Sequence, residues 1–228
     1  MMTGCHIRRD YMPTSTFFRL PGEKRERLMD AAWEEFTSSS YSDASINRII
    51  HKAHIPRGSF YQYFQDKEDL FWYLLGGMRE YFSGVFRELL QDAKGDLFSV
   101  PVRAFDRFVS RRGDPDPILT QCIQVMRLNQ GLDFQRFYAA EPGTLPEEFM
   151  ACIDLDHYRR KTPDFISHVF FLTVPPLAFA IMETLRDPDQ WERQRKFLQE
   201  RIEVVRTGSL TPQGNAAYEH QHQGGEQC

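Results

Sequence analysis

The amino-acid sequence predicts an all-α protein. Apolar residues recur at spacings of three and four positions in several stretches, as they do along the buried faces of amphipathic helices. Turn-forming residues separate these stretches, whereas no stretch reads convincingly as a strand and no internal repeat is visible. We therefore expect about nine helices, arranged as an N-terminal three-helix domain with a helix-turn-helix and a larger C-terminal helical bundle.

The chain of 228 residues is long enough for one small and one larger domain. Changes in composition and periodicity divide it into four expected segments. These are a flexible N-terminal arm (1–20), the helix-turn-helix domain (21–67), the larger helical domain (68–210) and a disordered polar tail (211–228).

The composition is ordinary for a soluble globular protein, with 41% hydrophobic and 26% charged residues. The four cysteines are far apart and show no metal-ligand spacing, so we expect a reduced, cytoplasmic protein without a metal site, a disulfide framework or a cofactor. The most apolar stretch, 165–182, contains His168 and two prolines and is short for a membrane span. We interpret it as a buried, kinked helix and expect no membrane segment.

Charge is divided unevenly along the chain. Residues 1–67 carry ten Lys and Arg against eight Asp and Glu, whereas residues 68–228 carry eighteen against twenty-four. The overall net charge of -4 argues against a protein that coats nucleic acid over its whole surface. A mildly basic N-terminal part on an acidic body is nevertheless compatible with local phosphate contacts.

The first predicted helix, 21–38, begins at a proline and has a stripe of residues that face the core: Leu28, Met29, Ala32, Trp33 and Phe36. A serine-rich loop follows, and residues 45–67 then have the pattern of a helix-turn-helix. Its first short helix, which Ser45 is placed to cap, has the stripe Ile46, Ile49, Ile50 and Ala53. Its second helix, from Pro56, would bury Phe60 and Phe64 and expose Arg57, Ser59, Tyr61, Gln62 and Tyr63.

Periodicity also predicts the elements beyond the helix-turn-helix. Asp66 can cap a long helix that reaches Gln91 and bridges the two domains. We then expect helices at 102–111, after the turn 112–115, at 145–161, from Pro163 onward and at 188–206, with an irregular segment at 131–146. Pro175 and Pro176 should kink or break the helix that contains them, near Thr173.

One stretch carries a family resemblance. RGSFYQYFQDKEDL, preceded by INRIIHKAHI and by an amphipathic helix ending in DAAWEEF, resembles the DNA-binding domain of TetR-family transcriptional repressors. The resemblance covers the first third of the chain, and the rest matches only in being helical and of suitable length. His54 departs from the pattern, which usually has Gly there; His adopts positive φ more readily than most residues, so we expect the turn to form.

A recognition helix in the major groove needs donors for base edges and neighbours that hold phosphates. Arg57 can donate to guanine and Gln62 can pair with adenine, while Gly58 permits close approach. The resemblance implies that the whole matching set contacts operator DNA: Ser45, Asn47, Arg48, Arg57, Gly58, Ser59, Tyr61, Gln62, Tyr63 and Lys67. For Tyr61, packing with an exposed tip remains an alternative.

The resemblance also implies a small hydrophobic or amphipathic effector in the larger domain and a homodimer formed by the last two helices. Candidate residues that line an effector pocket, for each of which an ordinary core position is the alternative, are Phe105, Phe108, Met126, Phe134, Phe137, Tyr138, Phe170 and Phe171. Candidate dimer-interface residues are Trp191, Phe197, Leu198, Ile202 and Val205. A two-fold dimer suits a palindromic operator, because one short helix reads few base pairs.

The hypothesis is therefore a dimeric repressor that its effector releases from a palindromic operator on double-stranded DNA. A constitutive DNA-binding regulator without an effector stays open as an alternative. An all-helical enzyme is the third hypothesis and the least favoured, because the chain lacks a nucleophile elbow, a metal-ligand cluster and a phosphate-binding glycine loop. Asp154, Asp156 and His157 lie close in sequence, but neighbouring positions on a helix do not share a face.

Overall fold

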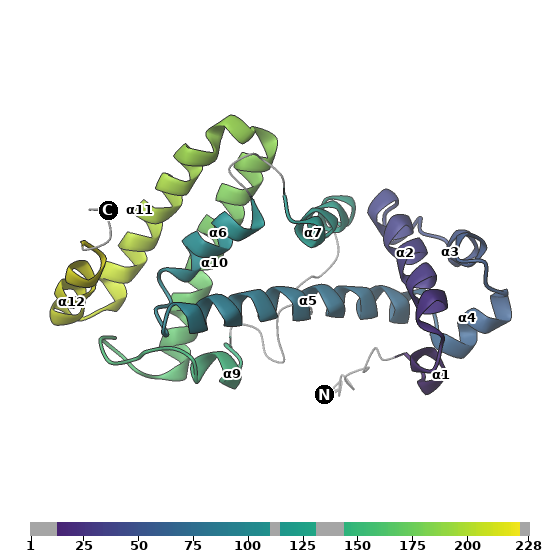
Figure 1. The fold of residues 1–228 in the computed structure, drawn as a ribbon, viewed down its shortest axis with the longest axis horizontal. Helices are drawn as coiled ribbons and strands as arrows, with labels where there is room; N and C mark the ends of the chain where they lie inside the picture. Colours follow the sequence, from purple (N-terminus) through teal and green to yellow (C-terminus); the bar gives the residue numbers. More distant parts are fainter. Residues whose placement is uncertain (1–12, 110–114, 131–143, 224–228) are drawn as a thin grey trace, which may run out of the picture. The chain divides into compact units, whose positions relative to one another are not determined.

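The computed structural model describes residues 13–109, 115–130 and 144–223. Within these ranges it contains eleven α-helices and one 3-10 helix, and its only β-type pairs are two isolated bridges (Figure 1). The predicted all-α class is confirmed.

The helices are α1 (Ser15–Phe18), α2 (Gly22–Ser38), α3 (Ile46–Lys52), α4 (Arg57–Tyr63), α5 (Lys67–Asp92), α6 (Val100–Phe108), α7 (Pro117–Leu128), α9 (Glu147–Met150), α10 (Pro163–Arg186), η1 (Pro188–Gln190), α11 (Trp191–Ser209) and α12 (Pro212–Gln223). The number exceeds the sequence prediction because α1 and α12 form where no helix was expected. Both are too short or too polar for apolar periodicity to reveal them.

The chain forms two compact units. The first comprises Met1–Glu80 and Thr120–Leu132, and the second Tyr81–Leu119 and Asp133–Cys228. The boundary between Glu80 and Tyr81 falls inside α5, so this one continuous helix contributes residues to both units. Each unit has its own core.

In the first unit, α2 packs on α3 and α3 packs on α4, which gives the predicted three-helix arrangement. Apolar side chains from these helices and from the start of α5 fill its core, with Leu28, Phe36, Ile49, Phe60, Phe64 and Phe71 fully buried or nearly so. Phe36 and Phe71 have ring centroids 4.9 Å apart, so α2 is joined to the beginning of α5. Most residues of the predicted inner stripes are therefore in the observed core, whereas Met29, Trp33 and Ile46 are half-buried.

The N-terminal arm was expected to be flexible up to residue 20, and the described part corrects this expectation. The backbone N–H of Thr14 donates to the carbonyl of Tyr63 at 2.9 Å, and α1 follows directly. The Phe17 side chain is fully buried, with its ring centroid 5.0 Å from that of Phe64 and 5.4 Å from that of Tyr73. One buried aromatic residue thus anchors a segment that has no periodicity.

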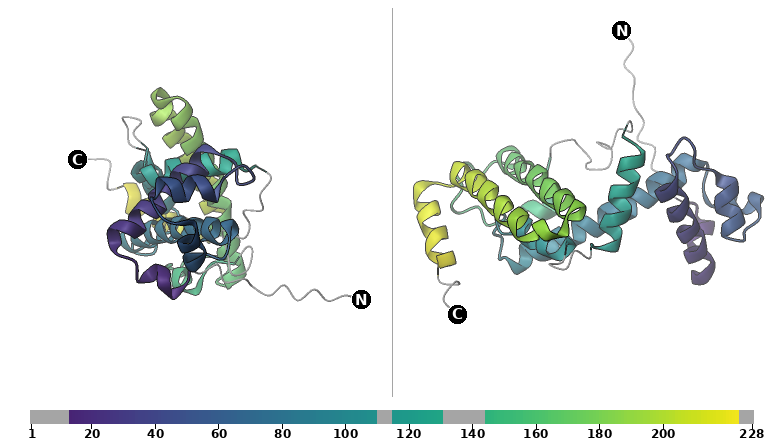
Figure 2. Two further views of the ribbon diagram at one scale, coloured as in Figure 1. Left: turned by 90° about the vertical axis from the view of Figure 1, so that its right-hand side faces the viewer. Right: turned by 90° about the horizontal axis from the view of Figure 1, so that it is seen from above.

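In the second unit, α10 and α11 lie side by side, and α6 packs against both (Figures 1 and 2). Phe105 and Phe108 of α6 point into this core and are 0% and 2% exposed. The Trp191 indole Nε1–H donates to the carbonyl of Val109 at 2.8 Å and ties the start of α11 to the end of α6. The helices α6, α10 and α11 thereby pack against one another.

Pro175 and Pro176 were expected to kink or break their helix near Thr173; the helix is not broken there, and α10 continues through them as one helix of 24 residues. The two prolines have no backbone N–H to donate within the helix. Val169 before the pair and Ile181 after it are both buried, so tertiary packing stabilises α10 on both sides of the prolines. Among the described helices, α10 alone is long and apolar enough to cross a membrane, with a mean hydropathy of 1.9. Core helices of soluble proteins meet the same criterion, so this is weak evidence for a membrane span.

Two further segments differ from the sequence predictions. The helix expected at 145–161 is limited to α9, after which turns place Ile153 and Tyr158 in the core. The tail expected to be disordered forms α12 up to Gln223. Arg206 of α11 explains the second difference: it is 5% exposed, donates to Asn215 Oδ1 at 2.7 Å, and has its guanidinium 4.7 Å from the centroid of the Tyr218 ring.

Replacing Phe17 with Ala should lower the free energy of unfolding of the first unit by about 3 kcal/mol, because a fully buried aromatic side chain leaves a cavity. Its neighbour Phe18 is 48% exposed and provides a matched control, so Phe18→Ala should change stability little. Urea unfolding followed by circular dichroism measures both variants. Equal effects of the two substitutions would contradict the anchoring role of Phe17.

Candidate nucleic-acid interface

The turn between α3 and α4 has the geometry of a tight helix-turn-helix. After α3, the residue His54 has φ of 53°, in the left-handed region, as expected from its place in the sequence. The N–H of Ile55 then donates to the carbonyl of Ile50 at 3.0 Å, and the Ile55 side chain is buried. Pro56 precedes the first residue of α4, so the second helix begins one position later than predicted.

The orientation of α4 is set by two buried rings one turn apart. Phe60 and Phe64 are both 0% exposed, which places the opposite side of α4 in solvent. Arg57, Gly58 and Gln62 are exposed there, and Tyr61 is 47% exposed. Ser59 is half-buried. A Cβ atom added to Gly58 would meet no atom within 4 Å, so nothing in the described fold itself requires glycine at this position.

Asn47 of α3 and Arg57 of α4 are brought together at this surface. The Arg57 Nη1–H donates to Asn47 Oδ1 at 2.6 Å, and both side chains are exposed. The bond holds the guanidinium in one direction while leaving its other N–H groups available for an acceptor. The two residues therefore form a pre-arranged pair of polar groups that spans both helices.

Arg48 has a structural partner that sequence reasoning missed. Its Nε–H donates to both carboxylate oxygens of Glu35 at 2.9 Å, and its Nη2–H donates to the carbonyl of Asp43 at 2.8 Å. Glu35 of α2 is 8% exposed and also accepts the backbone N–H of Ser45 at 2.7 Å. The expected side-chain cap from Ser45 is absent from α3, so this prediction was wrong.

Lys67 is also engaged within the unit. Its Nζ donates to the carbonyls of Tyr41, Ser42 and Ala44 at 2.6, 3.2 and 2.9 Å, and it lies 4.8 Å from the centroid of the Tyr41 ring. These bonds use the three hydrogens of the ammonium group. Lys67 therefore fastens the loop before α3 to the start of α5.

Tyr63 was expected on the exposed face of α4 with its hydroxyl near a phosphate. The structure corrects this expectation, because Tyr63 is only 3% exposed and its carbonyl accepts the bond from Thr14. Tyr63 is the last residue of α4, four residues after Ser59 and six after Arg57, and α1 packs against this helix. The contact with α1 could not be foreseen because no apolar periodicity indicates that helix.

The start of α5 has the predicted cap. The backbone N–H of Asp69 donates to Asp66 Oδ1 at 2.8 Å, and the N–H of Gln65 donates to Asp69 Oδ2 at 3.0 Å. The Asp66 carboxylate thus satisfies the N–H of Asp69, and the Asp69 carboxylate satisfies the N–H of Gln65, one residue before the position that pairs in a standard capping box. This fixes where the helix-turn-helix ends and the long helix begins.

Comparisons with known proteins agree with this geometry. The family model described as "Bacterial regulatory proteins, tetR family" matches residues 28–74, which contain most of α2, all of α3 and α4, and the start of α5. The match therefore covers the helix-turn-helix and its supporting helices. This part of the chain is similar to the DNA-binding domain of TetR-family regulators.

Curated relatives extend the similarity only part of the way along the chain. The transcriptional regulator AcuR of Cereibacter sphaeroides is 28% identical over 140 residues, which are 60% of this chain and 58% of that protein. The HTH-type transcriptional regulator YdgC of Bacillus subtilis is 45% identical over 49 residues, which are 22% of this chain and 25% of that protein. The chain thus spans about half or less of the length of these two relatives.

Two solved structures are similar to the chain. A TetR-family regulator from Chloroflexus aurantiacus is 24% identical, with a TM-score of 0.41, over 88% of this chain and 99% of that one. A TetR regulator from Rhodococcus is 14% identical, with a TM-score of 0.45, over 81% of this chain and 95% of that one.

The predicted effector-pocket residues do not form one group. Phe105 and Phe108 are core residues of the second unit, and Phe170 and Phe171 of α10 are half-buried there. Met126 is 41% exposed and belongs to the first unit. Phe134, Phe137 and Tyr138 lie outside the described residues.

The predicted dimer residues also separate into two sets. Leu198 and Ile202 are 0% and 4% exposed inside the chain's own core, and Val205 is half-buried. The Trp191 indole donates a hydrogen bond to the carbonyl of Val109. Phe197 is 37% exposed. Sequence periodicity identified the stripe of α11 that faces α10, whereas the neighbouring exposed face carries other apolar residues: Leu172, Phe179 and Met182 of α10, and Val204 of α11.

The pKa of Glu35 provides a test of the Arg48 contact. Burial by itself would raise this pKa, but the hydrogen bonds from Arg48 and Ser45 outweigh burial and hold it below the ordinary value of 4.5. The contribution of Glu35 to stability is therefore present above pH 4.5 and is lost as the pH falls through the lowered pKa.

Glu35→Gln should accordingly destabilise the protein at pH 7, and the difference from the parent should shrink as the pH is lowered below 4.5. The exposed neighbour Glu34 pairs with Lys52 at the surface, so Glu34→Gln is the matched control and should have little effect. Urea midpoints measured between pH 7 and pH 3 check this. A Glu35→Gln effect that does not change with pH would count against it.

Proposed function

We propose that this protein is a dimeric transcriptional regulator that binds a palindromic operator through α4 and acts as a repressor released by a small effector. The observation that carries the proposal is the exposed polar and aromatic face of α4, held outward by the burial of Phe60 and Phe64. A short helix with this exposed chemistry suits insertion into the major groove.

The direct contacts to DNA are assigned to the residues that remain exposed or half-exposed. Arg57, oriented by Asn47, donates to guanine, and Gln62 reads a neighbouring base edge. Tyr61 and Ser59 reach phosphates or base edges, and Gly58 lets the backbone approach the duplex. The open space around Gly58 supports this role, because any side chain there would project into the partner.

Three residues of the predicted set are given an indirect role. Arg48 and Lys67 hold the loop and the start of α3 through Glu35 and three backbone carbonyls, and Tyr63 lies in the core. Their contribution is to position α3 and α4. Ser45 shares features of the residues assigned to direct contacts and of those with an indirect role. Its backbone N–H donates to Glu35, while its side chain is half-exposed.

We assign the dimer interface to the exposed apolar face of α10 and α11, defined by Leu172, Phe179, Met182, Phe197 and Val204. Phe179 and Phe197 have ring centroids 6.1 Å apart, and the Arg201 guanidinium lies 3.8 Å from the Phe197 centroid. Clustered aromatic rings with a stacked arginine are typical of interface anchors. A two-fold copy would cover this face and present two recognition helices, about 34–36 Å apart on one face of a duplex.

The effector is assigned to the second unit, and α5 is the covalent route by which binding there would influence α4. The helix starts at the capping box next to the helix-turn-helix and continues into the core of the second unit. Phe82 and Phe86 of α5 contact Phe108 of α6, with centroids 5.4 and 6.5 Å apart. A ligand that rearranges these rings would act directly on α5.

Arg57→Ala should weaken binding to an operator selected from a random duplex library by about 10- to 100-fold, because a bidentate base contact is lost. Arg160, an exposed arginine of the second unit, is the matched control, and Arg160→Ala should retain the parental affinity. Fluorescence anisotropy with the labelled duplex measures both. Recovery of no palindromic site, or an Arg57→Ala variant with unchanged affinity and sequence preference, would refute the assignment.

Phe179→Asp together with Phe197→Asp should convert the dimer to a monomer, because two charges would be buried at the proposed interface. Met126→Asp is the matched control, since Met126 is a similarly exposed apolar residue of the first unit. Analytical ultracentrifugation measures the mass of each variant. A double variant that remains dimeric would place the interface elsewhere.

A further inference from the structure

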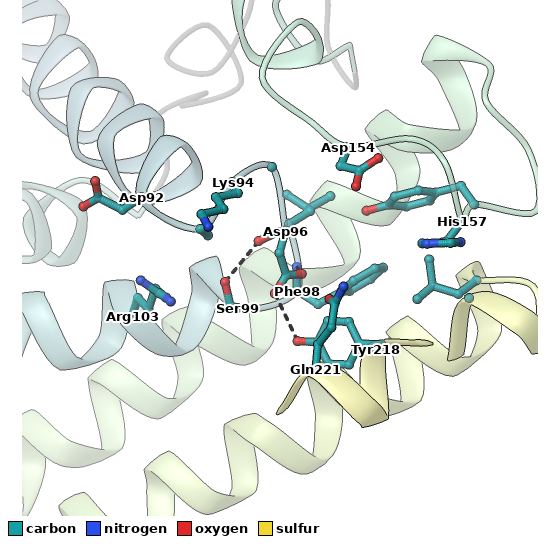
Figure 3. Close-up of a pocket in the computed structure, with 16 residues that line it drawn as sticks. Asp92, Lys94, Asp96, Phe98, Ser99, Arg103, Asp154, His157, Tyr218 and Gln221 are labelled. Atoms are coloured by element: carbon teal, nitrogen blue, oxygen red, sulfur yellow. Dashed lines mark hydrogen bonds between the residues drawn. The ribbon is translucent and has the colours of Figure 1, made fainter. Parts of the chain in front are cut away.

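A polar cavity of about 580 Å³ lies in the second unit, with walls that include the segment 92–99, the turn with Asp154, and α12 (Figure 3). Lys94 and Arg103 line it together with Asp96 and Asp154, so the charges of its walls favour neither an anion nor a cation. The first unit, in contrast, contains a buried amide group whose place in the fold bears on DNA binding.

This group is the side chain of Asn129, the residue directly after α7, which is 6% exposed. Its Nδ2 group donates at 2.7 Å to the carbonyl of Val125, one of the last four carbonyls of α7, which a helix cannot pair by itself. Its Oδ1 atom accepts the backbone N–H of Tyr41 at 2.6 Å, from 88 residues earlier in the chain. One amide group thus ends α7 and holds the loop between α2 and α3.

The loop that Asn129 holds, residues 39–44, is fixed by side chains that bond to its backbone. Lys67 donates to three of its carbonyls and Arg48 to a fourth. Both of these basic residues belong to the stretch 28–74 that matches the family model, whereas Asn129 lies well beyond it in the sequence. All of them are in the first unit. The helix-turn-helix is therefore supported in part by a residue outside the family match.

Tyr41 is held at both its N–H and its carbonyl. The N–H is bonded to Asn129, and the carbonyl accepts from Lys67 Nζ at 2.6 Å. The Tyr41 ring also packs on Phe71, with centroids 4.9 Å apart. A partly buried N–H that loses its acceptor costs free energy, so without the Asn129 oxygen this part of the loop would shift toward water or another acceptor.

A shift of the loop would reach the surface assigned to DNA through α3. The loop leads directly into this helix, and the second residue of α3 is Asn47. The Oδ1 atom of Asn47 accepts the Nη1–H of Arg57 at 2.6 Å. Hydrogen bonds weaken steeply when their geometry changes, so a displaced start of α3 would no longer hold the guanidinium in one direction.

We propose that Asn129 is a positioning residue for DNA binding, which sets the start of α3 by holding Tyr41 and thereby sets the direction of Arg57 through Asn47. The proposal rests on the DNA-binding function proposed above and adds a residue from outside the helix-turn-helix. Asn129 acts on contacts that read bases, whereas the attraction between basic side chains and phosphates does not depend on this geometry. The quantity that Asn129 controls is therefore the ratio of specific to non-specific affinity.

Asn129→Leu replaces the amide with an apolar side chain of similar size. It should weaken binding to the operator selected from a random library about tenfold, while binding to a duplex of unrelated sequence changes by less than about twofold. Gln130→Leu makes the same exchange at the exposed neighbouring residue and should keep the parental affinity for both duplexes. Fluorescence anisotropy at one salt concentration measures all variants. An equal loss on both duplexes, or no loss on either, would overturn the proposal.

Two further variants separate the acceptor from the bulk of the side chain. Asn129→Asp keeps an oxygen that accepts from the Tyr41 N–H in either protonation state, so it should recover most of the operator affinity lost in Asn129→Leu. Asn129→Ala removes the amide without adding bulk, should behave like Asn129→Leu, and takes its place if the leucine variant does not fold. Circular dichroism establishes that each variant is folded. An aspartate variant that binds the operator as weakly as the leucine variant would contradict the role of the acceptor.

Hydrogen exchange on the free protein, followed by NMR, tests the position of the loop without DNA. The Tyr41 amide should exchange at least about tenfold faster in Asn129→Leu than in the parent and in Gln130→Leu. The Phe64 amide, bonded to the Phe60 carbonyl at 2.9 Å, should be unchanged, whereas general destabilisation would accelerate both amides.

Unchanged protection of Tyr41 would overturn the positioning role whatever the DNA result. A parent protein that selects no operator would instead refute the proposed function, and the exchange of Tyr41 would still decide whether Asn129 fixes the loop.

Discussion

The candidate DNA-binding surface depends on the burial of two phenylalanine rings one helical turn apart. Phe60 and Phe64 have their ring centroids 5.9 Å apart and no exposed surface, so α4 has one rotational setting about its axis. Turning the helix to hide Arg57 or Gln62 would bring these rings into water, at a cost of about 1.5–3 kcal/mol for each ring. The chemistry of the exposed face therefore follows from the apolar side of the same seven residues.

Two basic side chains of the first unit act as internal connectors. Arg48 and Lys67 have the charge expected of phosphate-binding residues, yet their donors are directed at Glu35 and at the carbonyls of the loop before α3. Such bonds satisfy backbone oxygens that a short loop cannot pair by itself. The loop and the first turn of α3 are thereby held in place without a large apolar core, which a domain of this size cannot supply.

The sequence predicted those features that arise from local periodicity and from residues with restricted backbones. The stripes of α2 and α3, the positive φ of His54 and the cap formed by Asp66 and Asp69 all belong to this class. Features created by contacts between distant residues were not predictable. Phe17 meets Phe64 and Tyr73, and Arg206 meets Asn215, only after the chain has folded.

The same distinction applies to the proposed sites. Residues that read alike in the sequence, such as Tyr61 and Tyr63, differ by burial because only Tyr63 lies where α1 packs on α4. Phe197 and Leu198 are adjacent, but Leu198 faces α10 within the chain while Phe197 faces outward. The burial of Tyr158 has no sequence signal at all, since it results from a turn where periodicity suggested a helix.

The docking of α12 has a practical consequence for recombinant work. Arg206 is buried only because Asn215, Glu219 and the Tyr218 ring cover it. A shortened chain ending after Leu210, chosen to remove an apparently dispensable polar extension, would leave this guanidinium without those partners. Purification tags on this protein are better attached after Cys228 through a linker than fused in place of the last eighteen residues of the sequence.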